Sequence, residues 1–162
     1  MSSKKPLKLS ICIPSINADE LVNQLLVLED SMRNFKFTFE VIVQYDTKFE
    51  NKVFEVSESC GRLGYSLLSP INNGLDASIH ALLTQASGEF IWVLSGNDSI
   101  NADTLNAMGK AFQTDDIGLI FLNSKTPDGL FTAINTTGHD GISDFNTLLV
   151  TIGTRMSLIT SL

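Results

Sequence analysis

The hydrophobic positions of this chain alternate between short apolar runs and stripes at helical spacing. Apolar runs rich in β-branched and aromatic residues predict strands at 7–13, 37–43, 65–68, 90–94 and 117–122. Stripes with a period near 3.6 predict helices at about 17–32, 50–59, 74–86 and 102–112. Strands that alternate with helices are typical of an α/β fold in which most strands of the sheet are parallel.

The run at 90–94 is apolar throughout and shows no polar alternation. A strand that is half exposed alternates between apolar and polar residues, whereas a strand covered on both faces does not. We therefore expect this run to be a central strand with helices on both faces. The predicted architecture is a three-layer α/β/α fold with a mostly parallel central sheet.

Two of the predicted helices carry signals for their ends and for their buried faces. Asn17 is a suitable N-cap for the first helix, and Glu20 three residues later completes a capping box. We expect Gly88 to end the third helix. The expected buried stripes comprise Leu21, Leu25, Leu28 and Met32 in the first helix, and Leu75, Ile79, Leu82, Leu83 and Ala86 in the third.

The pattern changes after residue 123. It predicts a turn at 126–129, a short strand at 130–134, a loop at 136–141, a helix at 143–152 and a strand at 156–162. The last residues are apolar and carry no helix cap. We expect a single domain in which residues 7–123 form the core and 124–162 begin a further region, and we expect the chain to be truncated within that region.

Composition narrows the class of protein. With 162 residues, of which 43% are hydrophobic, the chain is long enough to bury one core. A formal net charge of −7 argues against a nucleic-acid partner, which needs a basic surface. Cys12 and Cys60 are expected to be reduced core thiols. We find no signal peptide and no apolar run of about 18 residues, so we expect a cytoplasmic chain without a transmembrane segment.

Polar residues follow several of the predicted strands, where parallel sheets bind their ligands. Pro14-Ser15-Ile16-Asn17 follows the first strand, Tyr45-Asp46-Thr47 the second and Ser95-Gly96-Asn97-Asp98 the fourth. Asn73-Gly74-Leu75-Asp76 stands at the entrance of the third helix. Taken singly, such residues also form turns, and Asn97-Asp98-Ser99 also fits a cap for the helix at 102–112. Taken together, they predict one pocket at the carboxyl edge of the sheet.

The order and spacing of these motifs, from Leu9 to Phe112, resemble the family 2 glycosyltransferases, which have the type A nucleotide-diphospho-sugar transferase fold. Residues 9–17 resemble the opening strand and Pro-x-x-Asn turn of that family. Residues 39–46 resemble its second strand, which normally ends in two aspartates. Residues 73–94 resemble its Asn-x-Gly helix, followed by Ala-x-Gly-Glu-Tyr-Ile and the central strand. The bacterial O-antigen and exopolysaccharide transferases are the most similar group.

This resemblance implies an enzyme that transfers a sugar from a nucleotide-diphosphate sugar to a saccharide or a lipid-linked acceptor, as in surface polysaccharide and lipopolysaccharide biosynthesis. A lipid-linked acceptor would place it at the inner membrane face. Asp98 matches the last aspartate of the metal motif, and Mn²⁺ and Mg²⁺ prefer such oxygen ligands. Asp46 matches the aspartate that holds the base or the ribose. The other donor-binding residues implied are Pro14, Ser15, Asn17, Asn73, Gly74, Asp76 and Asn97.

The chain also departs from the family pattern. Tyr45 stands where the first aspartate of the pair is usual, and Ser95 and Asn97 replace further acidic residues. The catalytic base of an inverting transferase is a carboxylate beyond the metal motif. We assign it to no residue, although the titratable side chains of that region are His139, Asp140 and Asp144.

Two other classes of function stay open from the sequence. A catalytically degenerate or truncated member would bind a nucleotide sugar, or only a partner protein, without turnover. A flavodoxin-like or receiver-like domain is the third class. The sequence disfavours the third class, because the first strand runs into Pro14 rather than into a phosphate loop or an acidic cluster.

Overall fold

The computed structural model describes residues 7–15, 18–45, 52–69, 74–94, 100, 102–114, 119–122 and 157–161. Strands and helices alternate as predicted through β5. The elements are β1 Leu9–Ser15, α1 Ala18–Met32, β2 Phe39–Tyr45, α2 Val53–Leu63, β3 Ser66–Leu67, α3 Gly74–Gln85, β4 Phe90–Val93, α4 Ala102–Ala111, β5 Leu119–Leu122 and β6 Ser157–Ser161. Strand β6 falls within the strand predicted at 156–162. The turn, strand, loop and helix predicted between 126 and 152 lie outside the described residues.

The strands form one sheet in the order β3-β2-β1-β4-β6-β5. β1 is parallel to both β2 and β4, and β2 is parallel to β3, so the mostly parallel arrangement is confirmed. β6 lies between β4 and β5 and is antiparallel to both. β4 therefore has a neighbour on each side, as expected for a central strand.

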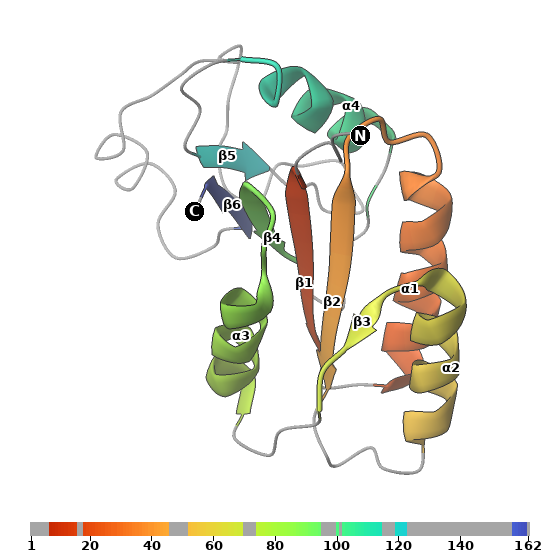
Figure 1. Cartoon of the computed structure of the whole chain (residues 1–162). Helices are drawn as coiled ribbons and strands as arrows, with labels where there is room; N and C mark the ends of the chain where they lie inside the picture. The colour runs from red at the N-terminus through yellow and green to blue at the C-terminus, as the bar shows by residue number, and fades with distance from the viewer. Residues whose placement is uncertain are drawn as a thin grey trace, which may run out of the picture.

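Helices cover both faces of the sheet (Figure 1). On one face, Ile11 and Ile13 of β1 belong to a large core that also contains buried residues of α1, α2 and α4. On the other face, Cys12 and Ile42 form a smaller cluster with Leu82 of α3. This division follows from the alternation of side chains along a strand. The three-layer α/β/α architecture is confirmed.

The predicted buried stripe is confirmed in α1 and is only partly right in α3. In α3, Ser78 and Leu82 are buried, whereas Leu75 and Leu83 are exposed. Apolar residues occur on more than one side of α3, so their spacing does not fix which side faces the sheet. Ser78 tolerates burial because its hydroxyl donates to the Gly74 carbonyl of the preceding turn, at 3.3 Å. In α1, the buried residues include Leu21, Leu25, Leu28 and Met32.

Two element boundaries differ from the prediction. β1 continues through Pro14 to Ser15 rather than stopping at residue 13. Pairing with β4 has already ended there, since the last bond runs from the Leu94 N–H to the Cys12 carbonyl at 2.9 Å. Pro14 lies two residues after Cys12 on the side of β1 that faces β4, so the N–H that proline lacks cannot extend this ladder. α2 lies later than expected, and it ends at Gly64, whose φ of 71° is a left-handed helix cap.

Gly88 does not end α3, which stops at Gln85. Gly88 instead lets the connection from α3 to β4 pass directly against β1. A Cβ atom at this position would lie 2.6 Å from the Ser10 nitrogen, and the Gly88 N–H donates to Ser10 Oγ at 2.8 Å. Ser10 Oγ donates in turn to the Glu40 carboxylate at 2.5 Å, which also accepts the Ser87 N–H at 2.8 Å. This network joins β1, β2 and the connection.

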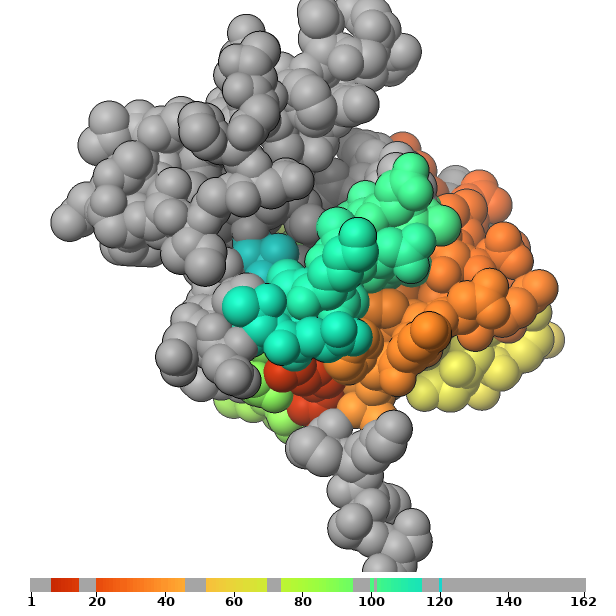
Figure 2. Space-filling view, turned by 90° about the horizontal axis from the view of Figure 1, so that it is seen from above, coloured from red at the N-terminus to blue at the C-terminus, as the bar shows by residue number. Residues whose placement is uncertain are grey.

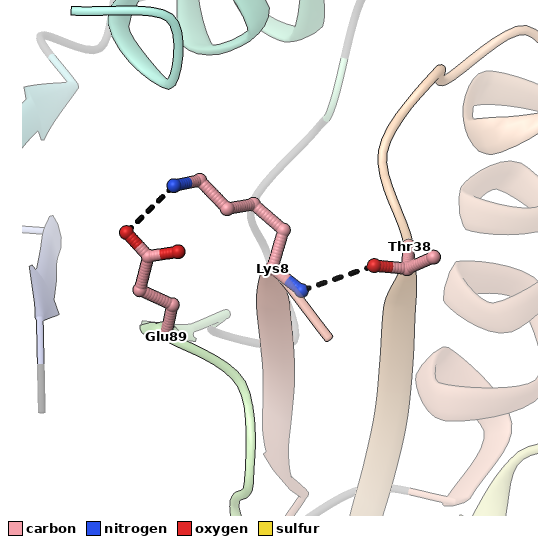
Figure 3. A network of polar contacts seen from close by, with 3 residues as sticks. All are labelled: Lys8, Thr38 and Glu89. Atoms are coloured by element: carbon pink, nitrogen blue, oxygen red, sulfur yellow. Dashed lines mark hydrogen bonds and ion pairs between the residues drawn. The ribbon is translucent and has the colours of Figure 1, made fainter. Parts of the chain in front are cut away.

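α4 lies across the end of the sheet at which β1 and β2 begin (Figures 1 and 2). The ring of Phe112, just after α4, packs against the ring of Phe90 at the start of β4, with the two ring centres 4.9 Å apart. The ammonium of Lys8 lies 5.0 Å from the centre of the Phe90 ring and 2.6 Å from the Glu89 carboxylate. The Lys8 backbone N–H donates to the Thr38 hydroxyl (Figure 3). These contacts close the amino end of the sheet.

The two cysteines are buried free thiols, as predicted. Cys12 belongs to the smaller cluster beside α3, and Cys60 of α2 belongs to the larger core. Burial raises the pKa of Cys12 to about 12, with a contribution from the nearby Glu40 carboxylate. Burial likewise raises the pKa of Cys60 to about 11. Both thiols are therefore protonated at neutral pH and neither is an activated nucleophile.

Within the described part of the chain, every helix is too short or too polar to cross a bilayer.

Candidate functional site

The carboxyl ends of β1, β2 and β4 meet at one edge of the sheet. Ser15, the last residue of β1, is the register partner of Tyr45, the last residue of β2. On the other side of β1, β4 runs in the same direction and reaches the level of Cys12. The connections that leave these strands therefore begin side by side, as the predicted pocket requires.

The N-terminus of α3 lies at this same edge. α3 connects β3 to β4, and both strands belong to the parallel part of the sheet, so the helix starts at the carboxyl edge and runs back along it (Figure 1). Gly74 begins the helix with a φ of 82°, a conformation that favours glycine. Asp76 is exposed in the first turn, where the helix dipole favours a carboxylate.

The structure describes part of the predicted site. Pro14 is buried in β1 and Ser15 ends that strand, while Gly74 and Asp76 begin α3. Asn17, Asp46, Asn73, Asn97 and Asp98 lie outside the described residues, as do His139, Asp140 and Asp144. In the sequence, Asp46 immediately follows β2 and Asn73 immediately precedes α3.

The structure explains why position 45 is occupied by a tyrosine. Its side chain is 3% exposed and belongs to the large core on the side of α1 and α2. The alternation along β2 turns it away from the face that carries Ile42 and α3. Tyr45, where the sequence resemblance leads one to expect an aspartate, therefore fills the core.

Gln44 lies at this edge, although its residue type alone does not mark it as functional. Its side chain is fully buried, and Pro14 is its register partner in β1. Its Nε2 donates to the carbonyl of Ser69, just beyond β3. Its Oε1 is buried and has no hydrogen-bond partner among the described residues. A buried acceptor left unpaired costs about 1–3 kcal/mol, so such groups are rare. The signal in the sequence is a glutamine that interrupts an apolar strand just before its end.

The described charge at the carboxyl edge is mainly negative. Glu20, Glu55 and Asp76 are exposed in the first turns of α1, α2 and α3, which all begin at this edge. Lys52, just before α2, is the cation on this side among the described residues. The remaining described cations belong to the amino end of the sheet: Lys8, Arg33, Lys36, Arg62 and Lys110. An anionic ligand at the carboxyl edge therefore needs a cation to offset the repulsion.

The oxygen donors that follow β4 in the sequence suit a divalent cation. No group of three or more His, Cys, Asp or Glu side chains able to hold a metal ion occurs among the described residues. The predicted ligand is the Asp98 carboxylate, and Asn97 beside it offers an amide oxygen. Both come shortly after β4 in the chain. Oxygen donors of this kind fit Mg²⁺ or Mn²⁺.

No protein-family profile matches the chain, and no curated protein sequence matches it. Solved structures do match. S. aureus TarS, residues 1–349, covers 96% of this chain with a TM-score of 0.66 at 20% identity. Its complex with UDP-GlcNAc covers 96% with a TM-score of 0.73 at 19% identity. The mannosyltransferase PcManGT from Pyrobaculum calidifontis, in complex with GDP-Man and Mn²⁺, covers 78% with a TM-score of 0.57 at 19% identity.

A different class of enzyme shares this architecture. The 4-diphosphocytidyl-2C-methyl-D-erythritol synthase from Anaerococcus prevotii covers 96% of the chain with a TM-score of 0.54 at 9% identity. The chain spans 47% of TarS 1–349 and 37% of the mannosyltransferase. At these identities the likeness shows the fold: an α/β fold like that of the type A nucleotide-sugar transferases.

Proposed function

We propose that this chain binds a nucleotide-diphosphate sugar at the carboxyl edge and is the donor-binding part of a family 2-like glycosyltransferase. The observation that carries the proposal is the match to UDP-GlcNAc-bound TarS over 96% of the chain, with a TM-score of 0.73. The donor-site motifs from the sequence belong to the strand ends that the parallel register brings together. The donors we favour are UDP and GDP sugars, the classes present in the TarS and mannosyltransferase complexes.

The proposed roles follow from chemistry and position. Asn17, Asp46 and the backbone at Pro14 and Ser15 hold the nucleotide, because they continue β1 and β2 at the shared edge. Asn73, Gly74 and Asp76 line the pocket from the start of α3, and Asn97 lines it from beyond β4. Asp98 holds Mn²⁺ or Mg²⁺, which supplies the positive charge that a diphosphate needs beside Glu20, Glu55 and Asp76.

In the proposed reaction, the bond between the anomeric carbon and the diphosphate oxygen breaks and a hydroxyl oxygen of the acceptor forms the new bond. The proton of that hydroxyl passes to a base, for which we propose no residue. The acceptor is a saccharide or a lipid-linked saccharide, as in surface polysaccharide synthesis. Residues 124–162 begin the acceptor side. If no acceptor is glycosylated, the chain is a nucleotide-sugar-binding protein without turnover.

The test is a thermal-shift titration with UDP, GDP and TDP sugars, with and without Mn²⁺. At a donor concentration 100 times Kd, binding adds about 2.7 kcal/mol of stability, or roughly 5–10 °C for a chain of this size. Asp98→Ala should abolish the Mn²⁺-dependent part of the shift. Asp30→Ala is the matched control, because Asp30 is exposed near the opposite end of α1 and pairs with Arg33 at 3.2 Å.

The outcomes separate binding from catalysis. If no donor shifts the melting temperature of the wild-type chain, the proposed donor site is wrong. If donors bind but Asp98→Ala behaves like Asp30→Ala, Asp98 is not the metal ligand and a helix-capping role is favoured. Chromatography that detects both released nucleoside diphosphate and a glycosylated acceptor establishes transfer.

A further inference from the structure

The amide of Gln44 is held in one orientation at the carboxyl edge. Its Nε2 is committed to the carbonyl of Ser69. Rotating the amide by half a turn would place Oε1 against that carbonyl, and two acceptors repel each other. The fixed orientation leaves Oε1 as a buried acceptor that has no partner in the described part of the chain.

The missing partner must be a hydrogen-bond donor, and this condition discriminates among the parts of a nucleotide sugar. A diphosphate at neutral pH offers acceptor oxygens and negative charge, so it cannot satisfy Oε1. The surroundings are apolar: Gln44 extends from the same face of β2 as Ile42, and Leu68 packs against the cluster on that face. A flat aromatic base with a ring N–H suits this environment better than a sugar that is hydroxylated on every side.

We propose that Gln44 Oε1 accepts the ring N–H of the donor nucleobase, N3–H of uracil or N1–H of guanine. This inference rests on the proposed function and assigns the base and the ribose of the donor to different residues. Gln44 reads the base from within β2. Asp46, two residues further along the chain, is left to accept the ribose hydroxyls.

The burial of Gln44 has a consequence for binding. The side chain is fully buried without ligand, so the base must displace the atoms that cover the amide. The new bond removes an unpaired acceptor from the interior, and its formation favours the bound state. Gln44 therefore acts as a specificity-determining residue and takes no part in bond breaking.

A chemical double-mutant cycle tests this contact. Affinities are measured by calorimetry with Mn²⁺ for UDP and N3-methyl-UDP, and for GDP and N1-methyl-GDP, on the wild type and Gln44→Met. Methionine keeps an unbranched side chain of similar size without the amide. In the wild type, methylation of the preferred base should weaken binding roughly 10- to 100-fold. In Gln44→Met the same methylation should cost less than about threefold.

Gln24→Met is the matched control. Gln24 is also a buried glutamine, but it lies on α1, on the other face of the sheet. This variant should keep the full methylation penalty. If Gln44→Met does not fold, Gln44→Leu serves in its place, because it also removes the amide and should likewise lose the penalty.

The two proposals fail in different ways. If neither UDP nor GDP binds the wild type, both the donor site and the Gln44 contact are wrong. If a diphosphate binds but methylation costs the same in the wild type and in Gln44→Met, only the Gln44 contact is wrong. A full penalty in Gln44→Leu, or a wild type indifferent to methylation, also overturns it.

Discussion

At the scale of single residues, Gly88 sets how closely the α3–β4 connection approaches β1. The position has no positive φ, so backbone conformation does not require glycine there. Space does, since a Cβ atom would lie 2.6 Å from the Ser10 nitrogen and 2.7 Å from the Leu9 carbonyl carbon. The conflict is with backbone atoms of the sheet, which cannot rotate away.

Gly88→Ala is therefore expected to lower the free energy of unfolding by about 1–3 kcal/mol, the range for overpacking in a closed interior. Gly61→Ala is the matched control, because Gly61 lies within helix α2 and a Cβ atom there would meet nothing within 4 Å. It should raise stability by about 0.5–1 kcal/mol, since alanine favours helix. Urea denaturation of both variants measures the contrast. Equal effects would contradict the close approach at Gly88.

Residue identity alone does not reveal the roles of Tyr45 and Gln44. The family resemblance directs attention to position 45 as a lost aspartate, whereas the structure places its ring in the core. In the sequence, Gln44 is a polar residue that interrupts an apolar strand. Only the fold shows its bond to Ser69 and its oxygen left unpaired among the described residues. Both roles depend on which face of β2 is covered by which helix, and that is a tertiary property.

At the scale of elements, α1 and α3 differ in how clearly the sequence shows which side of the helix is buried. α1 has one apolar stripe, so its buried side could be predicted. α3 has apolar residues on several sides, so the sheet decides, and it buries Ser78 and Leu82 while leaving Leu83 exposed. Periodicity predicts a helix in both cases and its orientation in only one.

This orientation predicts a large difference between two neighbouring leucines. Leu82→Ala removes a fully buried side chain from the small cluster beside α3 and should cost about 2–5 kcal/mol. Leu83 is 41% exposed, and Leu83→Ala should cost less than about 1 kcal/mol. Chemical denaturation compares the two variants. A cost at Leu83 equal to that at Leu82 would show that α3 packs with a different side toward the sheet.

At the scale of the whole molecule, each face of the sheet has one buried thiol in the core beneath its helices. Cys12 is buried beneath α3 and Cys60 lies in the larger core, so unfolding exposes both. The pKa of each is raised by burial, from 9.0 to about 12 and about 11 respectively. Above pH 9 the unfolded chain loses these protons while the folded chain keeps them, so high pH favours unfolding.

The free energy of unfolding should therefore be insensitive to these thiols below pH 9 and should fall as the pH rises toward 11. Denaturation curves between pH 8 and pH 11 measure this slope. The double variant Cys12→Ala with Cys60→Ala should show a shallower fall. Some slope should persist, because burial also raises the pKa of Tyr65. An unchanged slope in the double variant would show that the thiols are not protected by folding.

The sequence predicts the architecture well because alternating strands and helices leave few ways to build a parallel sheet. It also predicts which strand ends meet, since the carboxyl ends of parallel strands share an edge. It does not predict the place of β6, because pairing between distant segments leaves no local pattern. Asp46 and Asp98 remain predictions, since they lie outside the described residues.

The place of β6 has a consequence for how the sheet is assembled. β4 and β5 are close in sequence, yet each pairs with Ser157–Ser161 rather than with the other. While the chain is being synthesised, both therefore keep an unpaired strand edge until residues 157–161 emerge. Open edges of this kind recruit other strands, including those of neighbouring nascent chains. We expect the slow step of folding to be the insertion of this one strand, and the interval before it to be when the chain is most prone to aggregate.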